Sequence, residues 1–198
     1  MQQQGGVLAT VDILRPLIPR EVDELVLRSR GAHLEVGDTF DMAEDRRTLF
    51  LLASGRVRVF EPNHEGQEIT LSVVDGGTVL AQAGFAARRV SRAEALEPSV
   101  VLSLGWEDFE ALARRNPEVG VMMVRLLSER LGVCEDRLSN LVRKEVPARL
   151  ASLLLKFSEY QGIVVSDGSR KIPTRFTHRQ LASMVGANRE AVTRPSGG

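Results

Sequence analysis

The chain has 198 residues, and its 26 Lys and Arg equal its 26 Asp and Glu, so the formal net charge is zero. This length suits one or two domains, and the single cysteine excludes a disulfide framework or a cysteine-ligated cluster within one chain. Because no apolar run could cross a membrane and no signal peptide opens the chain, we expect a cytoplasmic protein with no membrane partner.

The first half of the chain is expected to be rich in β-strands. A short helix near residues 19–28 precedes a region from about Gly31 to Leu104 with many turn signals. Polar and apolar residues alternate at 56–59 and again at 68–73, as in half-buried strands. Many short strands at regular spacing predict a small barrel or roll.

Helical spacing follows the β-rich region. A helix starting at Glu107 ends before Pro117, and a longer one runs from about Glu118 to Arg143. Apolar residues along this longer helix recur every three or four positions. Such a stripe predicts a partner helix, with burial against the chain's own strands as the alternative. Its cysteine, Cys134, is expected to pack as a small apolar residue rather than to sense redox state.

The last third predicts a helix over about 147–160, then a loop or short hairpin, then two helices joined by a tight turn. Thr177 and Gln180 form a capping box at the start of the first of these two helices. Gly186 permits the turn, and Asn188 caps the second helix. Along these two helices we expect inward-facing apolar residues: Leu181, Met184, Val185, Ala191 and Val192.

The same segment carries a recognisable pattern, Leu-Ala-x-x-Val-Gly-x-x-Arg-Glu-x-Val-x-Arg. The chain has it at Leu181, Ala182, Val185, Gly186, Arg189, Glu190, Val192 and Arg194. Residues 177–194 therefore resemble the helix-turn-helix of the Crp/Fnr (catabolite activator) family of bacterial transcription regulators. An ordinary helix pair with a glycine turn is the alternative.

The resemblance implies an α+β fold in three parts. Residues 1–116 would form a cyclic-nucleotide-binding-like β-roll with flanking helices, residues 117–143 a dimerisation helix, and residues 144–198 a partial winged-helix-type helix-turn-helix domain. In the family the long helix pairs with its twin in a parallel homodimer. The implied interface residues are Val119, Met123, Leu127, Leu131, Cys134, Leu138 and Leu141.

The resemblance also implies a regulator that binds a palindromic site in double-stranded DNA, with RNA polymerase as a further candidate partner. The segment from Lys144 onward contains nine Lys and Arg but four Asp and Glu, and this excess of positive charge suits contact with DNA phosphates. The alternative is that these charges arise by chance and only solvate the surface of a small domain. Arg side chains can read guanine, and Glu can accept from cytosine. The candidate DNA-binding residues are Thr177, His178, Arg179, Asn188, Arg189, Glu190 and Arg194.

The effector cassette departs from the family pattern, which is Gly-Glu-Leu followed by Arg-Ser/Thr-Ala. Here the sequence reads Ala81-Gln82-Ala83 and then Arg89-Val90-Ser91, over a shorter segment. Gln82 carries no charge, and Val90 offers no hydroxyl, so we expect no binding of cyclic AMP or cyclic GMP. The weak effector candidates, which equally suit a solvated loop, are Gln82, Arg88, Arg89 and Ser91.

Enzymatic and metal-binding signatures are missing from the sequence. No phosphate loop, metal-ligand spacing or nucleophile elbow occurs, and the three histidines match haem ligands in residue type only. We therefore expect no cofactor, no metal and no enzyme.

Two functions remain open at this point. One is a dimeric, sequence-specific DNA-binding regulator with an unfamiliar effector. The other is a ligand-sensing or heterodimerising module, built on the β-roll and the dimer helix, that does not bind DNA. Pro195 follows Arg194 where family members continue the reading helix and then add a wing. We therefore expect an incomplete helix-turn-helix domain with impaired DNA binding.

Overall fold

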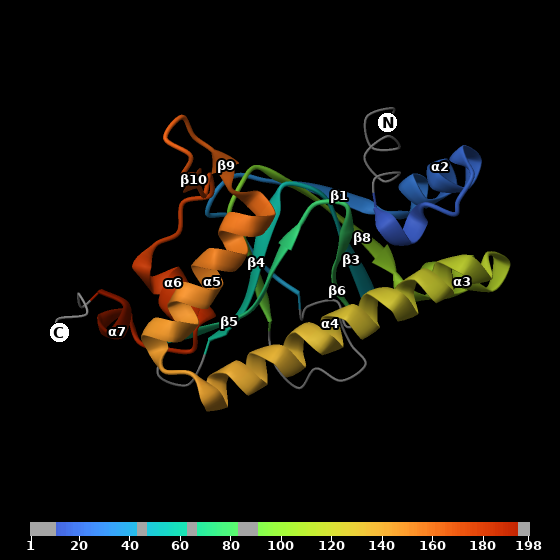
Figure 1. Cartoon of the computed structure of the whole chain (residues 1–198). Coiled ribbons are helices and arrows are strands. Elements are labelled where there is room, and N and C mark those ends of the chain that lie inside the picture. Colours follow the sequence, from blue (N-terminus) through green and yellow to red (C-terminus); the bar gives the residue numbers. More distant parts are fainter. Residues whose placement is uncertain (1–10, 43–46, 63–66, 83–90, 194–198) are drawn as a thin grey trace. The chain divides into compact units, whose positions relative to one another are not determined.

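A computed structural model of the chain describes residues 11–42, 47–62, 67–82 and 91–193 (Figure 1). These residues divide into two compact units. The first unit comprises Met1–Glu61 with Leu71–Arg130, and the second comprises Pro62–Thr70 with Leu131–Gly198. Strands dominate the first unit and helices the second, so the predicted α+β class is confirmed.

The strands form two four-stranded sheets, in the region where the short alternating segments predict a small barrel or roll. One sheet has the order β1-β8-β3-β6, with bounds Arg30–Leu34, Ser99–Gly105, Thr48–Ser54 and Thr78–Gln82. The other has the order β2-β7-β4-β5, with bounds Thr39–Asp41, Arg92–Ala95, Arg56–Pro62 and Glu68–Asp75. Strand β3 pairs antiparallel with both of its neighbours, β8 and β6.

Strand β3 lies between two apolar cores. Leu49 and Leu51 belong to a core shared with helices, whereas Phe50 and Leu52 belong to a core shared with strands of both sheets. Because successive side chains of a strand point to opposite faces, a strand covered on both faces must be apolar at every position. This explains the uninterrupted apolar run from Leu49 to Ala53.

Among the helices that contribute to the first of these cores are the 3-10 helix η1 (Asp12–Leu14), α2 (Pro19–Arg28) and α3 (Trp106–Arg115). Helix α2 has the predicted bounds, and α3 begins one residue earlier than expected. An ion pair of 2.7 Å between Arg28 Nη1 and Asp108 Oδ1 joins α2 to α3. The hydrogen bond to Asp108 raises the pKa of Arg28 above its ordinary value.

The long predicted helix is α4 (Pro117–Arg143), one continuous helix in Figure 1. Two residues expected at the dimer interface are instead buried in the core of their own chain: Val119 is fully buried and Met123 is 7% exposed. The alternative of burial against the chain's own strands therefore holds for these two residues. Further along, the apolar side chains are exposed: Val124, Leu127, Leu131, Leu138 and Leu141.

The second unit contains α5 (Val146–Gln161), a two-stranded hairpin of β9 (Ile163–Val164) and β10 (Arg170–Lys171), α6 (His178–Met184) and α7 (Arg189–Thr193). The segment expected to be a loop or hairpin is thus a hairpin. Its turn includes Asp167, whose pKa is lowered by hydrogen bonds from the side chain and backbone of Ser169. A stacked ring pair with centroids 4.8 Å apart, Phe157 and Phe176, links α5 to the segment that precedes α6.

Membrane insertion through a helix finds no support in the described part of the chain. None of its helices combines the length and the apolar character that crossing a bilayer requires.

Two glycines with positive φ give a matched test of turn packing. Gly55 joins β3 to β4 at φ +86°, and an added Cβ would overlap the Pro98 carbonyl oxygen and lie 2.7 Å from Ser99 Cα. Gly37 has φ +90°, but an added Cβ would meet nothing within 4 Å.

We expect Gly37→Ala to lower the free energy of unfolding by about 1–2 kcal/mol, the cost of left-handed backbone for a residue with a Cβ. Gly55→Ala should cost about 1–3 kcal/mol more, because backbone atoms block the new methyl group. Urea unfolding of both variants measures the difference. Equal losses would contradict the packing described at Gly55.

Candidate functional site

The capping box at the start of α6 is present as predicted. Thr177 Oγ1 accepts a hydrogen bond of 3.1 Å from the backbone N–H of Gln180, and Gln180 Oε1 accepts one of 2.8 Å from the backbone N–H of Thr177. These bonds satisfy two backbone donors that a helix start leaves unpaired. They therefore fix where the helix begins. They also engage the Thr177 hydroxyl in a hydrogen bond within the protein.

The turn between α6 and α7 depends on Gly186. Its φ of +63° is left-handed, and the backbone N–H of Ala187 donates a 2.9 Å hydrogen bond to the Ala182 carbonyl, as in a Schellman turn. An added Cβ at Gly186 would lie 3.1 Å from Leu141 Cδ2. The predicted role of Gly186 in ending the first helix is confirmed.

Helix α7 begins at a side-chain cap. Asn188 Oδ1 accepts a 2.9 Å hydrogen bond from the backbone N–H of Ala191, as expected for an N-cap residue. The expectation that Ala191 packs inward is wrong, because Ala191 is exposed, and Val192 is only half-buried. The five described residues of α7 bury no side chain.

The candidate DNA-binding residues gather at the N-terminal ends of these two helices. Arg189 and Glu190, at the start of α7, are both exposed. His178 Nδ1 lies 3.3 Å from Thr193 Oγ1, which joins the start of α6 to the end of α7. Because Thr193 donates its hydroxyl proton to the Arg189 carbonyl at 2.8 Å, His178 must donate from Nδ1. Arg194 lies outside the described residues.

Arg179 has a partner that the sequence pattern does not reveal. Its Nη2 lies 2.8 Å from Glu68 Oε1, in the short segment of β5 that belongs to the same unit. Thr70, from the same segment, has its Oγ1 2.6 Å from Ser183 Oγ, and both side chains are buried. Sequence reasoning identified residues 68–73 only as a strand, because these contacts span more than a hundred residues.

The predicted effector residues lie mostly beyond what the structure describes. Arg88 and Arg89 fall outside the described residues, and Gln82 is placed only by its backbone, opposite Leu49 in the β3–β6 pair. Ser91 Oγ donates a 3.2 Å hydrogen bond to Glu61 Oε1. The structure therefore brings together no anion-binding group from these four residues within its described part.

A buried ion pair between strands β4 and β7 was not expected from the sequence. Arg58, which the alternating pattern places on a polar face, is 3% exposed. Its Nε donates to Glu94 Oε2 at 2.7 Å, and its guanidinium lies 4.3 Å from the Phe60 ring centroid. Burial of a charge is tolerated when it is paired and hydrogen-bonded in this way. The polar side chains at 56–58 therefore do not mark a solvated face.

Metal binding finds no support in the residues that the structure describes. They contain no group of three or more His, Cys, Asp or Glu side chains placed to share an ion. Cys134, expected to pack, is instead exposed on α4.

Comparison with known proteins identifies both parts of the chain. Residues 33–116 match the family model of the cyclic nucleotide-binding domain, and residues 148–195 match that of the Crp-like helix-turn-helix domain. The chain is 33% identical over 181 residues to the cyclic AMP receptor protein of Thermus thermophilus, covering 90% of this chain and 80% of the relative.

Two further similarities agree with that match. The global nitrogen regulator of a Nostoc species is 28% identical over 175 residues, covering 83% of this chain and 78% of the relative. A solved transcriptional regulator of the CRP/FNR family, also from Thermus thermophilus, aligns with a TM-score of 0.65 at 25% identity, covering 83% of this chain and 82% of that one. These relatives are transcription regulators rather than enzymes, and the present chain belongs to the Crp/Fnr family of bacterial transcription regulators.

Proposed function

We propose that this regulator is a sequence-specific DNA-binding homodimer that acts in the cytoplasm and does not respond to cyclic AMP. Residues 1–116 would carry the sensing function, residues 117–143 would dimerise and residues 144–198 would bind DNA. The observation that carries the proposal is the helix-turn-helix: a capped α6, a left-handed Gly186 and a capped α7 with Arg189 and Glu190 exposed at its start.

That geometry suits reading of the major groove. A helix-turn-helix places the N-terminal residues of its second helix against base edges. Arg189 can donate to guanine O6 and N7 together, and Glu190 can accept from cytosine N4. Thr177 and Asn188 support this reading indirectly, because their side chains cap the two helices.

DNA binding by the 198-residue chain is expected to be weak. The sequence supports this expectation through Pro195, because a proline disfavours helical backbone at the residue before it. RNA polymerase is the further partner that we propose for the DNA-bound dimer, by analogy with the family.

Dimerisation is supported by the exposed side of α4. Its apolar residues alternate in spacing between three and four, as the two core positions of a heptad do: Val124, Leu127, Leu131, Cys134, Leu138 and Leu141. This seam begins with Val124, which the sequence-based interface omitted. A parallel dimer through the seam gives two reading helices for the two halves of a palindromic site.

The first test concerns the seam. Leu138→Glu should give a monomer, because a charge in a dry helix interface loses its hydration without gaining a partner. The matched control is Val133→Glu, at an exposed apolar position outside the seam, which should remain dimeric. Light scattering at micromolar concentration measures both. A monomeric parent chain, or a dimeric Leu138→Glu, would refute the proposed interface.

The second test concerns DNA readout. Preferred duplexes are selected from a random palindromic library with the parent chain, and affinities are measured by fluorescence anisotropy. We expect Arg189→Ala to weaken the selected site by about 1–3 kcal/mol and to relax one position in each half-site.

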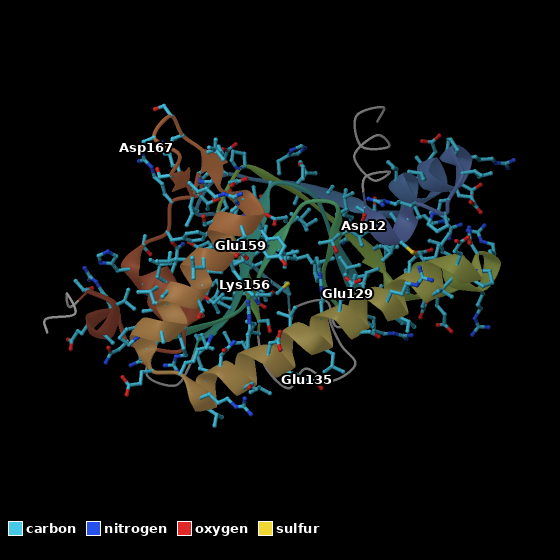
Figure 2. The ribbon with its side chains drawn as sticks, viewed as in Figure 1. Asp12, Glu129, Glu135, Lys156, Glu159 and Asp167 are labelled. Atoms are coloured by element: carbon cyan, nitrogen blue, oxygen red, sulfur yellow. The ribbon has the colours of Figure 1, made fainter. Side chains whose placement is uncertain are left out.

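Lys156→Ala is the matched control for that test, since Lys156 is an exposed residue of α5 (Figure 2), outside α6 and α7, and its replacement also removes one positive charge. It should change affinity little and leave the base preference unchanged. An Arg189→Ala chain with the parent's base preference would show the assignment to be wrong. A nanomolar, sequence-specific parent complex would contradict the expected weakness, and no DNA binding at all would favour the sensing or heterodimerising module.

The third test concerns the effector. The proposal that cyclic AMP is not bound is supported by the uncharged Gln82 and by Val90, which lacks a hydroxyl where the family cassette has one. A calorimetric titration of the parent chain with cyclic AMP should show no binding at micromolar concentration. Stoichiometric micromolar binding that Arg89→Ala abolishes would contradict the proposal and would identify Arg89 as the phosphate ligand.

A further inference from the structure

The start of strand β5 has an inverted burial pattern. Ile69 is 47% exposed, whereas its polar neighbour Thr70 is 6% exposed. Because burying a hydroxyl without a partner is costly, the contact that covers Thr70 must supply a hydrogen bond. Ser183, on the buried side of helix α6 in the same unit, supplies it with an Oγ–Oγ distance of 2.6 Å.

The direction of this hydroxyl contact follows from the other bond of Ser183. Ser183 Oγ donates its single proton to the Gln180 carbonyl at 2.8 Å, so Thr70 donates to Ser183. Both side chains are shielded from water, which strengthens a hydrogen bond relative to an exposed one. The contact therefore holds the first residues of β5 against helix α6, the first helix of the helix-turn-helix.

Glu68 lies two residues before Thr70 and so shares its face of the strand. Its carboxylate meets the Arg179 guanidinium at 2.8 Å, with side-chain exposures of 18% for Glu68 and 62% for Arg179. A carboxylate and a phosphate bind a guanidinium through the same charge-assisted hydrogen bonds. Glu68 thus occupies the group that would otherwise be offered to a DNA phosphate.

We propose that Glu68 competes with the DNA backbone for Arg179, so that the described contact restrains DNA binding until the pair separates. This inference rests on the proposed DNA-binding function. The restraint is modest rather than absolute, because an ion pair with one largely exposed partner is weak and is screened by salt. The buried Thr70–Ser183 contact makes it persistent, since it keeps Glu68 within reach of Arg179.

The test compares Glu68→Gln, which removes the charge and keeps the shape, with the parent chain on the same duplex. Affinity is measured by fluorescence anisotropy over a series of salt concentrations. We expect affinity to rise about two- to fivefold for each half-site, the range that a weak ion pair represents. The slope of log affinity against log salt should steepen by about 0.9 for each of the two Arg179 side chains of the dimer, the value of one additional phosphate contact each.

Two further variants separate the specific contact from a general change in charge. Glu159→Gln removes an exposed carboxylate of α5 (Figure 2) and should leave the salt slope unchanged. In an Arg179→Gln background, Glu68→Gln should no longer raise affinity or steepen the slope. A gain that persists without Arg179, or a Glu68→Gln chain that binds as the parent does, would overturn the inference alone. Absence of DNA binding in every variant would overturn the proposed function and the inference with it.

Discussion

Helix α4 carries more apolar surface than its own chain covers, and this constraint governs how the protein can assemble. Its 27 residues extend about 40 Å at about 1.5 Å per residue. The first turns are covered by the chain's own core, through Val119 and Met123 with Met122 and Leu126 packed beside them. An exposed apolar row of this length is typical of an interaction surface, and the partner that we propose is a second copy of the helix, because the row has heptad spacing.

The helix-turn-helix of α6 and α7 depends on small local contacts rather than on a large core. Thr177 and Asn188 cap the two helices, and Gly186 sets the turn between them. Such contacts fix directions accurately but stabilise modestly, at about 1 kcal/mol for a cap. Further support comes from the buried Ala182 of α6, from Val185 at its C-cap and from the Phe157–Phe176 stack, whereas the described residues of α7 bury no side chain.

Helix caps and turns could be predicted from the sequence, because their signals are local. Pro19 marks the start of α2, the capping box marks the start of α6, and the turn residues separate short strands, because caps and turns act over three or four residues. Much of the fold and the position of the reading helices could therefore be predicted from the residues alone.

Contacts between distant segments could not be predicted in the same way. Val119 and Leu138 share one helical stripe, yet only tertiary packing decides that the first is covered by its own chain. The alternating pattern predicts that Arg58 is solvated, because its partner Glu94 lies 36 residues away in the sequence. The pairing of Arg179 with Glu68 spans 111 residues and leaves no local pattern in either segment.

Cys134 offers the most direct measurement of the central claim, a parallel and in-register dimer through α4. It is the only cysteine, it is exposed, and it occupies a core position of the exposed heptad row. In a parallel dimer the two copies face each other, so mild oxidation should give a disulfide-linked dimer that Cys134→Ser abolishes. A chain whose thiol reacts with a small alkylating reagent but which stays monomeric on a non-reducing gel after oxidation would contradict the claim.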